Sequence, residues 1–104
     1  MINAIEIKIE NIDYLFGYKR YNPLKIYHVG KSWPKHTSCT IVKGKNNNGY
    51  VSSIEVIGTG IVIKHEKDLD NPRLAKILAT KKAMKYIKDK ELRTKLWKEL
   101  LNKI

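Results

Sequence analysis

Cysteine is almost absent from this chain of 104 residues, and Cys39 is its single example. One thiol can form neither a disulfide nor a four-ligand zinc site within the chain, and the surrounding Ser-Cys-Thr-Ile-Val predicts a small buried or half-buried thiol in a strand. No run approaches the roughly 18 consecutive apolar residues of a membrane-spanning helix. The first residues also lack the pattern of a signal peptide. These absences predict a cytoplasmic protein with no membrane partner.

Catalytic and metal-binding patterns are lacking as well. Gly58-Thr-Gly60 precedes a predicted strand and not a helix, so it is not a dinucleotide or phosphate-binding fingerprint. Asp68 and Asp70 lie beside a helix start, where carboxylates ordinarily cap the helix and complement its dipole. The histidines lack the spacing of metal ligands; they are His28, His36 and His65. The sequence therefore predicts no enzymatic activity, no cofactor and no metal.

Acidic side chains are scarce in the last third of the chain. Residues 71–104 carry 11 basic and 3 acidic side chains, a net charge of +8, whereas residues 1–70 carry 10 and 7, a net charge of +3. A field of this sign attracts polyanions, so we expect an anionic partner: a nucleotide, a nucleic acid or an acidic protein surface. The alternative is that lysines only solvate the outer faces of two helices.

The first two thirds of the chain shows the alternation of apolar and charged residues that is typical of half-buried strands, most clearly over residues 5–10. Residues 44–49 predict the turn of a hairpin, and Gly58 and Gly60 predict a kink or bulge. The expected strands lie within about residues 3–65 and include the segments 14–19, 24–29, 38–43, 50–57 and 61–65.

From Pro72 onward the apolar residues recur with a helical period. Asn71 is suited to cap a first helix over about residues 72–87, with Pro72 at its first position, and Asp89 to cap a second over about residues 90–103. We therefore predict a single α+β domain over residues 1–104. Its antiparallel sheet of about five strands is followed by two C-terminal helices packed on one face.

The first predicted helix has one narrow face of small residues, with Lys76 and Lys82 at its two edges. Ala75, Ala79 and Ala83 on that face would admit a flat ligand or another backbone at close range. Flanking ammonium groups would then meet the phosphates of a ligand. The alternative is ordinary packing of the helix on the sheet, with lysines that extend to solvent.

The second predicted helix has a broad apolar face that predicts core packing or an oligomer contact: Leu92, Leu96, Trp97, Leu100, Leu101 and Ile104. Arg93 falls within this arc, so its guanidinium needs a carboxylate, a carbonyl or a bound anion as partner. We expect Arg93 and Lys76 to converge at the start of the paired helices. Trp33, in a loop beside lysines, predicts either a stacking platform for a base or a lid on the end of the sheet.

Residues 58–97 resemble a family of small phage proteins with a recurring signature. In that signature a strand with Gly leads to His or Asn and then Asp, followed by Gly-Arg-Lys, an Ala-x-x-Arg-Ala-Leu segment, and a second helix with Arg and Trp. The corresponding positions here are Gly60, His65, Asp68, Ala75, Lys76, Ala79, Lys82, Ala83, Met84, Arg93 and Trp97. Asp70 stands where the family has an aromatic residue, and Lys76 and Lys82 stand for its arginines.

The family includes the first-described Thoeris anti-defence proteins, sponges that sequester cyclic ADP-ribose signals made by bacterial immune systems. The resemblance implies a phage-encoded protein in the cytoplasm of the host cell. This protein would bind a small phosphorylated nucleotide without cleaving it. It also implies homo-oligomers with pockets between subunits. The candidate ligand-binding residues are Lys76, Lys82, Arg93, Asp68, Arg73, His65 and Trp33.

Two alternatives from other classes are open at this point. One is a basic protein that binds nucleic acid, or inhibits a nucleic-acid-binding defence effector such as a CRISPR nuclease. The other is a structural or host-takeover protein whose target is an acidic protein surface.

Overall fold

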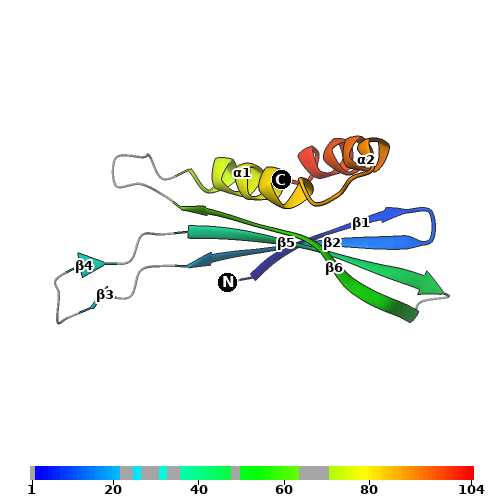
Figure 1. Ribbon diagram of the computed structural model, residues 1–104, viewed down its shortest axis with the longest axis horizontal. Helices are drawn as coiled ribbons and strands as arrows, with labels where there is room; N and C mark the ends of the chain where they lie inside the picture. Colours follow the sequence, from blue (N-terminus) through cyan, green and yellow to red (C-terminus); the bar gives the residue numbers. More distant parts are fainter. Residues whose placement is uncertain (1, 22–24, 27–30, 33–35, 48–49, 64–70) are drawn as a thin grey trace.

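The computed structural model is an antiparallel sheet with two helices after it in the chain, an α+β arrangement (Figure 1). It describes residues 2–21, 25–26, 31–32, 36–47, 50–63 and 71–104. The strands are β1 (Ile2–Ile9), β2 (Ile12–Tyr21), β3 (Lys25–Ile26), β4 (Lys31–Ser32), β5 (His36–Asn47) and β6 (Tyr50–Ile63), and the helices are α1 (Pro72–Met84) and α2 (Lys90–Leu101).

The main sheet has four strands in the order β1-β2-β5-β6, and all neighbours are antiparallel. The predicted α+β class with an antiparallel sheet and two C-terminal helices is thus confirmed. The number of about five strands needs correction: the predicted segment 50–57 and the described part of 61–65 belong to the single strand β6, and the described part of 24–29 pairs outside this sheet. The register of β6 against β5 shifts twice, between Ile41 and Val42 and between Lys43 and Lys45, so bulges bend this strand without ending it. β3 and β4 pair only with each other.

One face of the sheet carries the aromatic and branched side chains that alternate along the strands. Phe16 lies between Ile5 and Ile41 in the register, and Gly58 continues this row into β6. Figure 1 shows both helices on the same side of the sheet. Strand and helix residues together form the core: Ile7, Tyr14, Phe16, Tyr18, Cys39, Ile41, Ala79, Ala83, Met84, Ile87, Leu96 and Leu100.

Both helices begin where the capping residues predict. Asn71 accepts a hydrogen bond from the Leu74 amide at 3.1 Å, and Asp89 accepts one from the Glu91 amide at 3.0 Å. The helix α1 ends at Met84, earlier than the predicted end, because the Ile87 amide bonds to the Met84 carbonyl at 3.0 Å and so closes a tighter turn. Ile87 remains buried, so the apolar period continues beyond the helix itself.

The small residues of α1 lie against the two glycines of β6. A Cβ on Gly60 would overlap the carbonyl oxygen of Ala79, and one on Gly58 would overlap that of Ala83. Ala79 and Ala83 are fully buried in this contact. The alanine face was expected to admit either a flat ligand or another backbone, and the structure shows the second. No ligand fits between Ala79, Ala83 and the strand.

The apolar face of α2 is used in the core. Leu96 and Leu100 are fully buried, and Leu92, Trp97 and Ile104 pack against them in part. Core packing therefore accounts for this arc except for Leu101, which is 47% exposed. No helix in the part of the chain that the structure describes is both long enough and apolar enough to cross a membrane.

Candidate anion-binding site

The two helices differ in the charge of their first turns. The helix α2 has the usual arrangement, with Asp89 as its cap and Glu91 in its first turn, so that carboxylates complement the positive end of the dipole. The helix α1 has no acidic residue in its first turn. Arg73 and Lys76 lie three residues apart there and so share one side of the helix, which we call the basic start of α1. This end of the helix therefore favours an anion.

Lys76 is held over the sheet by Tyr18. Its ammonium lies 5.7 Å from the centre of the Tyr18 ring, a cation–π contact, and its backbone carbonyl accepts a hydrogen bond from the Thr80 hydroxyl at 2.7 Å. The Tyr18 and Thr80 hydroxyl oxygens are 2.6 Å apart. Because Thr80 uses its one proton on the carbonyl, Tyr18 must be the donor in this pair. Burial raises the pKa of the Tyr18 phenol far above its ordinary value, so the proton it donates is retained.

Arg20 belongs to the same end of the molecule. It follows Tyr18 by two residues in β2, so it lies on the same face of the sheet, and the register places it beside Thr37 and Val62. Arg20 is half-buried. Sequence reasoning did not select it as a site residue. Its spacing of two from Tyr18 could have placed it on the helix-facing side of the sheet, because Tyr14, Phe16 and Tyr18 on the same strand are all part of the core.

Lys82 lies on the other side of α1. Its ammonium donates to the carbonyl oxygen of Ile61 at 3.1 Å, on the edge strand β6. The helical spacing predicted that Lys76 and Lys82 flank the alanine face, and they do so, but the Gly60 backbone occupies the space between them. One small ligand cannot lie on the alanine face and bridge the two ammonium groups.

Arg93 is at the junction of the two helices. One of its guanidinium nitrogens donates to the carbonyl oxygen of Ile87 at 3.0 Å, which supplies the partner that an arginine in an apolar arc requires. Met84 follows Lys76 by eight positions, or about 12 Å of helix, and Arg93 bonds beyond that end of α1, so the predicted convergence of Lys76 and Arg93 is wrong. The apolar period of α2 placed Arg93 near the core but contained no information on where the preceding turn would place a carbonyl.

Three predicted ligand-binding residues, Asp68, His65 and Trp33, lie outside the described residues. The structure therefore brings together Arg73 and Lys76, with Arg20 at the same end of the sheet, and separates them from Lys82 and Arg93.

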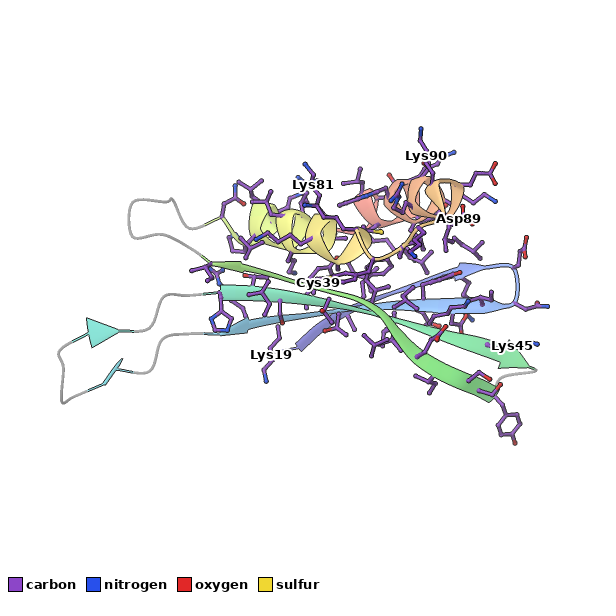
Figure 2. All side chains as sticks on the ribbon, in the orientation of Figure 1. Lys19, Cys39, Lys45, Lys81, Asp89 and Lys90 are labelled. Atoms are coloured by element: carbon purple, nitrogen blue, oxygen red, sulfur yellow. The ribbon has the colours of Figure 1, made fainter. Side chains whose placement is uncertain are left out.

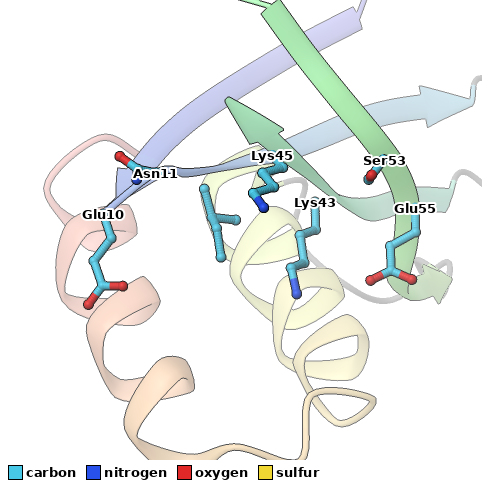
Figure 3. Close-up of a pocket in the computed structure, with 7 residues that line it drawn as sticks. Glu10, Asn11, Lys43, Lys45, Ser53 and Glu55 are labelled. Atoms are coloured by element: carbon cyan, nitrogen blue, oxygen red, sulfur yellow. The ribbon is translucent and has the colours of Figure 1, made fainter. Parts of the chain in front are cut away.

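A separate open hollow of about 400 Å³ lies near the other end of the sheet (Figure 3). Glu10 and Ser53 on its rim have backbone φ angles of 56° and 55°, a left-handed conformation that is costly for residues other than glycine. Its lining has two lysines and two glutamates, so their formal charges cancel and it does not select an anion. The lining residues are Glu10, Asn11, Ile12, Lys43, Lys45, Ser53 and Glu55.

Cys39 lies beneath α1 (Figure 2) and is fully buried, as predicted. Burial raises the pKa of its thiol, so the reactive thiolate is disfavoured. Within the described ranges, no three histidine, cysteine or carboxylate side chains are grouped in a way that could hold a metal ion.

Comparison with protein-family models, curated proteins and solved structures finds no match to this chain.

Proposed function

We propose that this chain is a non-enzymatic, phage-encoded anti-defence protein of the host cytoplasm. It would bind a small phosphorylated nucleotide signal, such as a cyclic ADP-ribose isomer, and sequester it without cleavage. The observation that carries the proposal is the basic start of α1, which has no neutralising acid in its first turn and lies at the same end of the sheet as Arg20. The family resemblance of residues 58–97 supports the same ligand class.

In this proposal the backbone dipole of α1 and two side chains act together on phosphate. Arg73 is exposed and can present a bidentate fork, whereas Lys76 is half-buried and held in place by Tyr18. Lys82 and Arg93 each use only part of their hydrogen-bonding capacity on a carbonyl. They could contact a phosphate of a ligand bound elsewhere, but not together with Lys76 on the alanine face.

The test is retention of intact ligand. The protein is incubated with a cyclic ADP-ribose isomer, separated from free ligand and denatured by heat, and the released nucleotide is identified by mass spectrometry. We expect intact ligand. Arg73→Met and Lys76→Met should each lower affinity at least tenfold, since a charged hydrogen bond contributes about 1.5–3 kcal/mol. Lys81→Met removes an exposed lysine of the same helix and is the matched control. Cleaved ligand, or none retained, would contradict the proposal.

A second candidate, nucleic-acid binding, is favoured by the lysines on the outer faces of the helices. Lys81 and Lys90 extend away from the sheet (Figure 2). Besides Lys82, the exposed lysines of the helices and of the connection between them are Lys81, Lys85, Lys88, Lys90, Lys95 and Lys98. A protein that neutralises several phosphates should lose orders of magnitude in affinity between about 50 and 200 mM salt, much more than a site for a two-phosphate ligand. A gel-shift titration with DNA and RNA at both salt concentrations separates the two candidates.

A further inference from the structure

The face of the sheet that points away from the helices has an uncharged centre. The register places Leu15, Val42 and Val56 side by side across three strands, and Gly17, Thr40 and Thr59 form the next row. Leu15 is 41% exposed and Val56 is 60% exposed. Beyond these rows, Ile61 and Ile63 of β6 are also more than half exposed. No described element covers this face (Figure 1).

A group of exposed apolar side chains at the centre of an open sheet face is unusual for a chain in which 30% of residues are charged. The charged residues in the register on this face lie on β1 and toward the two ends of β2, outside the part shared by β5 and β6. They are Glu6, which is the β1 neighbour of Leu15, and Lys8, Asp13 and Lys19. The excess of lysines is on the opposite side, on the outer surfaces of the helices. Two copies could therefore approach through this face while their most basic surfaces stay apart by much more than the Debye length of about 8 Å at physiological salt.

The edges of the sheet are less suited to association than its face. Lys82 donates to the Ile61 carbonyl on β6, and Lys103 donates to the Glu6 carbonyl on β1 at 2.9 Å. On each outer strand, a lysine ammonium thus occupies a carbonyl oxygen that an added strand would need as a hydrogen-bond acceptor. Lysines at sheet edges commonly prevent such pairing. The face has no aromatic side chain in its two central rows, which disfavours stacking of nucleic-acid bases.

We infer that this face, centred on Leu15, Val42 and Val56, binds the same face of a second copy of the chain. β2 has 10 residues paired with β5. Ten residues on each of β2, β5 and β6, together with the eight of β1, cover roughly 620 Å² at the usual rise and strand spacing. Two such faces bury roughly 1,240 Å², at the lower end of the range of about 1,200–2,000 Å² for specific interfaces. The dimer has two stacked sheets inside and the helices outside, an aligned packing that is common for sheets.

The experiment is analytical ultracentrifugation of the full chain, without nucleotide, up to about 200 µM. We expect a mass of twice 12.1 kDa. Leu15→Lys should weaken the dimer at least tenfold. Leu101→Lys should leave it unchanged, because Leu101 is a leucine of similar exposure, 47%, on the helical side. The dimer should also strengthen between about 50 and 500 mM salt, because the copies have the same charge. Anion binding should instead weaken as salt is added. The dimer and the proposed nucleotide binding can therefore fail independently of each other.

Three results would overturn the inference: a monomer at all concentrations, a Leu15→Lys variant that remains a dimer, or equal weakening by Leu101→Lys. A monomer would leave this face to a partner of different chemistry. If circular dichroism shows that Leu15→Lys does not fold, Val56→Lys on the outer strand is assessed by the same criteria, since its side chain is more exposed.

Discussion

Gly60 packs against Ala79 so closely that no side chain fits between strand and helix. A Cβ on Gly60 would lie 2.7 Å from the Ala83 nitrogen and 2.8 Å from the Lys82 Cβ, as well as overlapping the Ala79 carbonyl oxygen. Two of these three atoms belong to the helix backbone, so relief requires movement of the whole of α1. The glycine is thus needed for the approach of two backbones.

Gly60→Ala should therefore lower the free energy of unfolding by about 3 kcal/mol or prevent folding, at the upper end of overpacking effects. Gly17→Ala is the matched control, because a Cβ there meets nothing closer than 3.8 Å. We expect it to be neutral or to stabilise by about 0.4–1 kcal/mol through the unfolded chain. Urea denaturation of both variants measures the difference. Equal effects would show that α1 is not in this close contact.

The bond between Tyr18 and Thr80 predicts unequal effects of removing its two partners. Tyr18→Phe leaves Thr80 with its bond to the Lys76 carbonyl, so it should cost only about 1 kcal/mol. Thr80→Val leaves the buried Tyr18 hydroxyl without its acceptor and should cost about 1–3 kcal/mol. The double variant should be less destabilised than the sum of the two. Additive losses in a double-mutant cycle would contradict a direct bond.

Stability should decrease at high pH, partly because of Tyr18. The phenol has a raised pKa in the folded protein, chiefly through burial, whereas in the unfolded chain it ionises near its ordinary value of 10.0. Its contribution is therefore complete below pH 10 and is lost as the pH rises above it, because only the unfolded state then releases the proton. At about pH 10.5 wild type should lose roughly 0.8 kcal/mol more than Tyr18→Phe, relative to pH 8. Urea titrations at both pH values test this; equal losses would refute it.

Arg93 should be more important for stability than for binding. Arg93→Met removes the bond to the Ile87 carbonyl that joins α2 to the turn after α1 and should lower the free energy of unfolding by about 1–2 kcal/mol. Nucleotide binding should be unchanged wherever the variant is folded, since Arg93 lies far from the basic start of α1. Thermal melts and binding measured side by side distinguish the two roles. Lost binding with unchanged stability would move the site to the helix junction.

The sequence predicted those features that depend on neighbouring residues. The isoleucines at alternate positions over residues 5–9 indicated β1, and Asn71 and Asp89 marked both helix starts. The segment 14–19 contains Gly17, and a glycine weakens a strand, yet β2 lies inside the sheet and contributes Phe16 to the core. Gly17 is tolerated because it lies on the face away from the helices.

Features that depend on distant partners were not predictable from residue patterns. Gly58 and Gly60 predicted a kink or bulge, and a register shift does fall beside Gly58, but nothing in the local sequence shows that α1 packs against these two glycines. The same applies to Lys82, for which a phosphate and the Ile61 carbonyl are equally good acceptors until the fold places one within reach. Site residues inferred from charge alone are therefore the least secure, and Arg20 was missed because it lies in a strand.

The bond from Lys103 to the Glu6 carbonyl joins positions 97 residues apart. By contrast, the hairpins of β1 with β2 and of β5 with β6 join strands that follow one another directly in the chain. Because long loops close slowly, we expect these hairpins to form early and α2 to dock on β1 late. Until then Ile7 and Tyr14 remain accessible to solvent. The docking of α2 therefore determines how long a folding intermediate exposes the apolar face of the sheet. Slow docking would favour aggregation through that face.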